Sequence, residues 1–126
     1  MTAMATKESL AGMRILIVED EYLLAADLSR ALQSRKVTVI GPHPDVSSGL
    51  RALQAGGIDA AVLDVNLRGQ NSYPIAGELA ARGIPFLFTT GYDDWAIQPE
   101  YAHVARLEKP FDSRAFLLAV QKLLGR

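Results

Sequence analysis

The sequence predicts an α/β domain in which helices flank both faces of a doubly wound, five-stranded parallel sheet. Two observations lead to this fold class. Short runs of branched apolar residues alternate along the chain with segments in which apolar residues recur at helical spacing. The first run, residues 14–18, is apolar at almost every position, as in strands that are buried on both faces. Parallel neighbours require right-handed crossovers, which place helices over the sheet.

One domain accounts for the length of the chain. It has 126 residues, 49% of them hydrophobic, which is enough for one buried core and too short for two ordinary domains. We expect the domain to cover residues 13–126. Residues 1–12 have no sustained apolar period and are expected to form a flexible N-terminal leader.

Composition excludes several classes of partner. Thirteen basic and fourteen acidic residues give a formal net charge of −1 without a Lys/Arg cluster, so direct DNA binding is not expected. No apolar stretch is long enough to span a bilayer and no signal sequence is present, so we expect a cytoplasmic protein without membrane insertion. The absence of cysteine excludes disulfides and thiolate metal sites.

The first half of the domain should contain three strands and two helices. After residues 14–18, helical spacing of apolar residues predicts the first helix, and residues 37–40 form the second strand. Asp45 is placed to cap the second helix, which ends at the two glycines of residues 56–57. Residues 60–63 form the third strand, which ends at Asp64.

The third helix and fourth strand come next. Ser72 is expected to cap the helix, with Pro74 tolerated in its first turn and Gly83 just past its end. The fourth strand should cover residues 85–89. Residues 93–101 have only weak amphipathic character, and Pro99 interrupts them, so the fourth helix is expected to be short or mobile.

The fifth strand gives the weakest pattern of the five. We place it at residues 105–108, immediately before Lys109. Asp112 or Ser113 then caps the last helix, which has well-spaced apolar residues for its inner side.

Polar residues stand where four of the predicted strands end, at the edge where open α/β sheets bind ligands. They are Glu19 and Asp20 after the first strand, Asp64 after the third, Thr90 after the fourth and Lys109 after the fifth. Taken singly, each residue has an ordinary explanation as a turn, cap or solvated residue. Together they predict that three carboxylates, a hydroxyl and an ammonium converge.

Three close carboxylates repel one another unless a cation lies among them. An all-oxygen set with room for water suits Mg²⁺, and the lack of histidine and cysteine in this set disfavours zinc. The predicted metal ligands are Glu19, Asp20, Asp64 and the backbone carbonyl of Asn66.

A carboxylate can also attack phosphorus when a metal and a positive side chain neutralise the transferring oxygens. Asp64 suits the role of nucleophile that forms an aspartyl-phosphate, and Lys109 that of the neutralising cation. The Thr90 hydroxyl could donate a hydrogen bond to a phosphoryl oxygen.

These patterns together resemble response-regulator receiver domains over residues 14–124. The runs that carry the resemblance are Ile-Leu-Ile-Val-Glu-Asp-Glu, Val-Leu-Asp-Val-Asn-Leu, Phe-Thr-Thr-Gly and Lys-Pro-Phe. The resemblance implies a flavodoxin-like strand order with five helices, Mg²⁺ as essential ion, and a histidine kinase or histidine phosphotransfer protein as phosphodonor. It also implies that Asp64 is the phosphoacceptor, that Glu19 and Asp20 are metal-site acids, and that Thr90 and Lys109 contact the phosphoryl group.

One receiver feature is missing from this chain. Receivers commonly have an aromatic switch residue three positions before the lysine, where this chain has Arg106. The chain is similar to stand-alone receivers with a Phe-Ala-Thr-Gly-like motif, which lack that aromatic and have a poorly ordered fourth helix. We therefore expect residues 91–104, with Trp95, Ile97 and Tyr101, to change order on phosphorylation, and residues 91–108 to contact a downstream protein partner. Tyr92 is expected to shield the phosphoryl group from water.

Two other functions remain open on the sequence. A phosphatase of the haloacid-dehalogenase type would also form an aspartyl-phosphate, but it would carry a second acid where this chain has Asn66. A pseudo-receiver acting only as a binding module would lack the acceptor, the acids or the lysine, and this chain has all of them. We expect a phosphoacceptor with self-catalysed phosphorylation and dephosphorylation, which signals through a protein partner or a phosphorelay, rather than an enzyme acting on a separate substrate.

Overall fold

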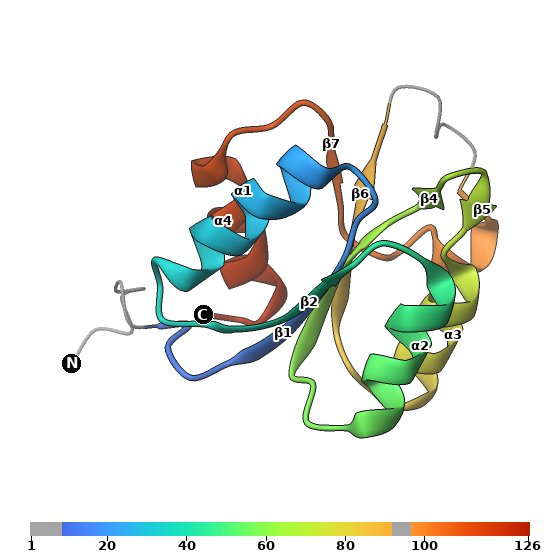
Figure 1. Ribbon diagram of the computed structural model, residues 1–126, viewed down its shortest axis with the longest axis horizontal. Helices are drawn as coiled ribbons and strands as arrows, with labels where there is room; N and C mark the ends of the chain where they lie inside the picture. Colours follow the sequence, from blue (N-terminus) through green and yellow to red (C-terminus); the bar gives the residue numbers. More distant parts are fainter. Residues whose placement is uncertain (1–8, 92–96) are drawn as a thin grey trace.

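A five-stranded parallel sheet forms the centre of the protein, as the computed structural model of residues 9–91 and 97–126 shows (Figure 1). The strand order is β2-β1-β3-β6-β7, and every neighbouring pair is parallel. The strands are β1 (Arg14–Val18), β2 (Thr38–His43), β3 (Ala60–Asp64), β6 (Phe86–Thr90) and β7 (Arg106–Glu108). This order confirms the predicted flavodoxin-like, doubly wound fold.

In the described part of the chain, four α-helices cover the two faces of the sheet. The helices are α1 (Tyr22–Gln33), α2 (Val46–Ala55), α3 (Tyr73–Ala81) and α4 (Ser113–Leu123). Helices α1 and α4 lie on one face, and α2 and α3 on the other (Figure 1). The described part of residues 93–101 begins at Ile97 and contains the short 3₁₀ turn η1 (Pro99–Tyr101), which Pro99 starts rather than interrupts.

The core has two layers because side chains in β1 alternate between the two faces. Leu16 and Val18 point into the cluster under α2 and α3, whereas Ile15 and Ile17 point into the cluster under α1 and α4. All five residues of β3 and of β6 are buried. Burial on both faces explains why these strands read as continuous apolar runs.

Strand β2 extends beyond the predicted residues 37–40. It runs from Thr38 to His43 and contains Gly41 and Pro42, a pair that usually ends a strand. Proline cannot donate a hydrogen bond to a neighbouring strand, but β2 lies at the edge of the sheet, where this loss is tolerated.

Two of the three predicted helix caps are confirmed. Asp45 accepts a hydrogen bond from the Ser48 amide, and Asp112 accepts one from the Ala115 amide, both at 2.8 Å. The predicted cap by the Ser72 side chain is wrong. Ser72 occupies the N-cap position of α3, but its hydroxyl makes no capping bond, and Asn71 Oδ1 instead accepts from the Tyr73 amide at 3.1 Å.

The ordered domain begins before residue 13, so the predicted extent of the leader is wrong for residues 9–12. Leu10 is only 1% exposed and belongs to the cluster under α1 and α4. The Gly12 amide donates to Lys36 O at 2.9 Å, and Gln121 donates to Ser9 Oγ at 3.1 Å. A single buried leucine leaves no periodic pattern. Residues 1–8 lie outside the described part of the chain.

A small hairpin follows β3 that the sequence did not predict. Strands β4 (Asn66–Leu67) and β5 (Gln70–Asn71) pair antiparallel around a two-residue turn. The turn residues Arg68 and Gly69 have φ values of 54° and 81°, as in the tight turns that join hairpin strands. Within the described residues, no helix is both long and apolar enough to cross a membrane.

Candidate functional site

Three carboxylates lie together at the carboxyl edge of the sheet. Glu19 and Asp20 follow β1, Asp64 ends β3, and the two strands are neighbours with Val18 paired to Leu63. One carboxylate oxygen from each residue lies within 4.8 Å of the other two. Glu19 and Asp64 are each 3% exposed. The predicted acidic cluster is therefore assembled in the fold, and two of its members are removed from water.

Lys109 reaches this cluster from the end of β7. Its Nζ lies 3.1 Å from Asp64 Oδ2, 3.3 Å from Glu19 Oε1 and 2.5 Å from Glu21 Oε2. The Lys109 amide also donates to Thr90 O at 2.8 Å. Burial alone would lower the pKa of the ammonium, but the hydrogen bond to Glu21 and the charges of Asp64 and Glu19 raise it above its usual range. Lys109 is therefore positively charged at neutral pH.

Burial governs the ionisation of Asp64. Burial and the charge of Glu19 raise the pKa of Asp64 to about 8, although Lys109 opposes the shift. Burial also raises the pKa of Glu19, against the hydrogen bond from the Glu21 amide and the charge of Lys109. The two carboxylates therefore disfavour being ionised together. A cation between them would oppose both shifts, because its charge favours the ionised carboxylates.

The residues present fit a hard divalent cation. All three acidic side chains offer oxygen, and Glu19 Oε1 is buried without a hydrogen-bond partner in the described part of the chain. The Lys109 ammonium contacts this Oε1 atom as an ion pair and not as a hydrogen bond. Mg²⁺ in proteins is bound by oxygen ligands, among them carboxylate oxygens that are not already occupied by a hydrogen-bond donor.

Asn66 and Thr90 lie beside the acids, as expected from the strand ends. The Asn66 amide donates to Asp64 Oδ1 at 3.2 Å, and the Asn66 side chain accepts from the Gly69 amide at 3.0 Å. Thr90 is the last residue of β6, one position beyond Thr89, which pairs with Asp64. Tyr92 and Trp95, the other expected contributors, lie outside the described residues.

Two charged neighbours of the cluster were not predicted from the sequence. Glu21 forms the shortest contact of Lys109, and Arg68 Nε lies 3.8 Å from Asp20 Oδ2. Glu21 continues the acidic run after β1, which was its only sequence signal. The position of Arg68 depends on the hairpin and could not be read from the strand pattern.

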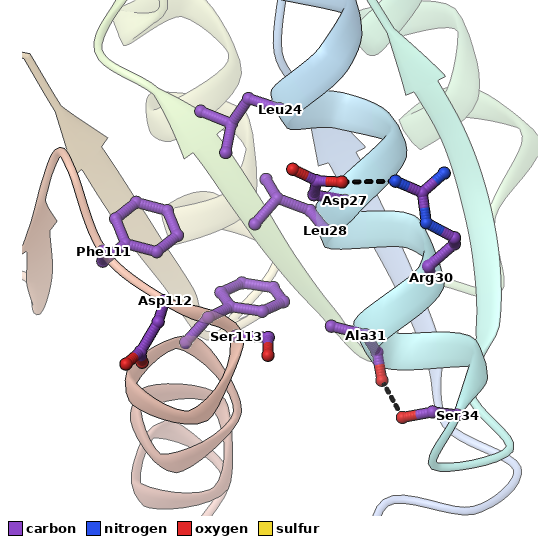
Figure 2. A pocket seen from close by; sticks show the side chains of 10 residues that line it. Leu24, Asp27, Leu28, Arg30, Ala31, Ser34, Phe111, Asp112 and Ser113 are labelled. Carbon is purple, nitrogen blue, oxygen red and sulfur yellow. Dashed lines mark hydrogen bonds and ion pairs between the residues drawn. The ribbon is translucent and has the colours of Figure 1, made fainter.

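A groove between α1 and α4 is separate from the acidic cluster. It encloses about 490 Å³ and is lined by apolar residues such as Leu24, Leu28 and Phe111 and by an equal number of polar residues (Figure 2). Phe111 stacks against Phe116, with ring centroids 6.1 Å apart. None of the clustered acids Glu19, Asp20 and Asp64 lines the groove. The groove is thus a feature of the helical face and not part of the carboxylate site.

The strand order, the acidic cluster and the lysine define a phosphoacceptor module of the receiver type. The profile of the response regulator receiver domain matches residues 15–121. The chain therefore belongs to the receiver-domain family of two-component response regulators. Receiver domains accept a phosphoryl group from histidine kinases or phosphotransfer proteins, and they bind Mg²⁺ at an acidic pocket.

Several solved structures and curated proteins are similar to this chain. The solution structure of SdrG from Sphingomonas melonis Fr1 is 43% identical, has a TM-score of 0.81, and aligns over 89% of this chain and 96% of that one. The BeF3-activated conformation of SdrG gives 43% identity and a TM-score of 0.76, over 90% and 98% of the two chains.

Curated relatives are longer than this chain. The uncharacterized transcriptional regulatory protein YbdJ of Bacillus subtilis is 30% identical over 90% of this chain, which spans 51% of YbdJ. Sensor kinase CckA of Brucella abortus is 32% identical over 89% of this chain, which spans 12% of CckA. The chain thus spans about half the length of YbdJ and a smaller share of CckA. The shared part is the receiver domain.

Proposed function

We propose that this protein accepts a phosphoryl group on Asp64, from a phosphohistidine of a kinase or phosphotransfer protein, in a Mg²⁺-dependent reaction in the cytoplasm. The proposal rests on the ion pair between Asp64 Oδ2 and Lys109 Nζ, which are 3.1 Å apart within a cluster of three carboxylates. Glu19, Asp20, Asp64 and the carbonyl of Asn66 would hold the ion. When bound, Mg²⁺ would neutralise charge on the transferring phosphoryl oxygens.

The transfer exchanges one bond to phosphorus for another. A carboxylate oxygen of Asp64 forms the new bond, and the bond from phosphorus to the donor imidazole nitrogen breaks, with the electron pair leaving on nitrogen. The Lys109 ammonium donates a hydrogen bond to Asp64 and would stabilise the negative charge on the phosphoryl oxygens during transfer. The amide of Asn66, already bonded to Asp64 Oδ1, orients the acceptor. The Thr90 hydroxyl would donate to a phosphoryl oxygen.

The donor must approach through residues around the mouth of the site, because Asp64 itself is buried. Tyr22 and Leu23 begin α1 directly after the acidic run and are 83% and 76% exposed. Large apolar side chains this exposed next to a reactive site are suited to contact a protein partner. We assign the donor-facing surface to the start of α1.

A second surface would carry the signal to a downstream protein. Ile97, Tyr101 and Val104 anchor the described part of residues 91–108 to the core under α2 and α3. The Gln98 amide donates to Tyr73 Oη at 3.0 Å, and Arg106 donates to Ala102 O at 3.3 Å. Arg106 thus occupies the place of the missing switch aromatic with its charge at the surface. This supports the subclass without that aromatic and a signal read through residues 91–108.

Phosphorylation can be tested directly by intact-protein mass spectrometry after incubation with Mg²⁺ and a small phosphodonor such as acetyl phosphate. Wild type should gain one phosphoryl group that is lost in base, and Asp64→Asn should gain none. Asp20→Asn should bind Mg²⁺ more weakly and label more slowly, because an anionic ligand is removed. Equal labelling of Asp64→Asn and wild type would exclude Asp64 as the acceptor.

A turnover assay with a phosphate ester, beside the labelling experiment, separates the alternatives. A phosphatase would turn over a phosphate ester that is not a phosphodonor, and Asn66 offers no acid for that chemistry. A pure binding module would take up no phosphoryl group in any variant.

A further inference from the structure

Arg68 is held at the mouth of the acidic cluster by the β4-β5 hairpin. It is the first residue of the two-residue turn, and the bond from the Gly69 amide to Asn66 Oδ1 closes that turn. Its Nε lies 3.8 Å from Asp20 Oδ2. The Arg68 side chain is 74% exposed, whereas that of Asp20 is 15% exposed. The arginine therefore stands on the solvent side of a carboxylate that faces the cluster.

The cations around the cluster divide the acids between them. Lys109 Nζ forms ion pairs with Glu19, Glu21 and Asp64. In the part of the chain that the structure describes, the ion pair of Asp20 is instead with Arg68. Asp20 thus has a positive neighbour that is long, mobile about several bonds and in contact with water, unlike the confined Lys109.

We propose that Arg68 is a positioning residue that competes with Mg²⁺ for Asp20, and so sets the ion concentration at which the acidic cluster fills. The inference rests on the proposed assignment of Asp20 as a metal ligand. A guanidinium within ion-pair distance lowers the attraction of Asp20 for a second cation, and it must swing away when the ion is bound. Its exposure lets it do so without disturbing the core.

The expected effect is modest and has a definite sign. Exposed ion pairs are weak, so removing the Arg68 charge should tighten Mg²⁺ binding by about two- to five-fold. The difference should shrink as ionic strength rises, because water and salt screen a pair at the surface.

Isothermal titration of the full chain with MgCl₂ tests this competition without any phosphorylation. Arg68→Gln removes the charge and Arg68→Lys retains it. Both keep a long non-glycine side chain at this position of the turn. Arg30→Gln is the matched control, because Arg30 is similarly exposed and pairs with Asp27 on α1, away from the cluster. We expect a lower dissociation constant for Arg68→Gln and values near wild type for Arg68→Lys and Arg30→Gln. Equal constants for wild type and Arg68→Gln, or an equal gain in Arg30→Gln, would overturn the proposal.

A double-mutant comparison shows whether the effect acts through Asp20. In an Asp20→Asn background, Arg68→Gln should no longer change Mg²⁺ affinity, because the group for which the two cations compete has lost its charge. An undiminished gain in that background would refute competition at Asp20. If Asp20→Asn alone leaves the affinity unchanged, the proposed metal ligand is wrong, and that failure is distinct from a failure of the Arg68 assignment.

Discussion

The rings of Tyr73 and Tyr101 stack at an angle of 14° with their centroids 5.1 Å apart. Both rings also meet Phe88 edge-on, at 6.3 Å and 6.0 Å. Phe88 is two residues before Thr90 on β6, so both side chains lie on the same side of the sheet. The stack therefore joins the start of α3, the strand that carries Thr90 and the segment proposed to contact a downstream partner.

This arrangement predicts that phosphorylation alters the anchoring of residues 97–104. Amide hydrogen exchange, with and without beryllium fluoride as a phosphoryl mimic, should show its largest change in residues 91–104. The reason is that Thr90 precedes this segment directly and the described part of the segment is anchored to the core by only Ile97, Tyr101 and Val104. The same measurement on Asp64→Asn is the control and should show no change. A change confined to another face would rule out this route for the signal.

Tyr101 should contribute packing more than hydrogen bonding. Tyr101→Ala would leave a cavity against Tyr73 and Phe88, and we expect it to lower the free energy of unfolding by about 2–4 kcal/mol. Tyr101→Phe keeps the stack and should lie within about 1 kcal/mol of wild type. Urea unfolding measures both. A Tyr101→Phe loss as large as that of Tyr101→Ala would indicate that the hydroxyl, not the ring, holds the segment.

Lys109 should matter more for the phosphorylation rate than for folding. Lys109→Ala removes the ammonium that lies 3.1 Å from the acceptor, and we expect labelling to slow by roughly 10²-fold. Cooperative urea unfolding should be retained, because the lysine lies at the end of a strand and outside both core clusters. Lys122→Ala, in the last turn of α4, is the control. Loss of cooperative unfolding in Lys109→Ala would assign the lysine a structural role.

The pKa of Asp64 predicts how Mg²⁺ and pH act together on stability. The folded value of about 8 is above the ordinary value of 3.8, so the fold binds this proton more tightly than the unfolded chain does. That contribution is fully present below pH 3.8 and is lost as pH rises through about 8. Mg²⁺ needs the ionised carboxylate, so the increase in Tm on adding MgCl₂ should be larger at about pH 8 than at about pH 5.

Thermal unfolding at the two pH values, with and without MgCl₂, measures this coupling. Asp64→Asn has no titrating group at this position, so its pH dependence should be flatter. A Mg²⁺ effect on wild type that is independent of pH would contradict the proposed role of the buried carboxylate.

Leu10 should behave as a core residue although it precedes the first strand. Leu10→Ala removes a side chain that is 1% exposed, and we expect unfolding to become easier by about 2–4 kcal/mol. Leu118→Ala, at a position 56% exposed on α4, should change stability by less than about 0.5 kcal/mol. Equal, small effects of the two substitutions would show that residues 9–12 do not stabilise the domain.

Local patterns predicted most of the fold because the elements that define it have strong local signals. The runs that became β1, β3 and β6 are buried on both faces, and Asp45 and Asp112 cap their helices through contacts three residues away. The missed features depend on distant partners. The Arg68-Gly69 turn lacks the asparagine or aspartate that marks most such hairpins, and Leu10 is buried only because α1 and α4 cover it.

The central residues of the site were predicted from the sequence alone, since parallel strands bring their carboxyl ends to one edge whatever their separation along the chain. Glu19, Asp20, Asp64 and Lys109 could therefore be grouped before any coordinates. Only the tertiary structure decided how charge is distributed among them. Burial raises the pKa of Asp64. Lys109 forms ion pairs with Glu19 and Asp64, and the hairpin brings Arg68 to Asp20. These outcomes depend on distances and solvent exclusion, which arise from packing and have no counterpart in residue order.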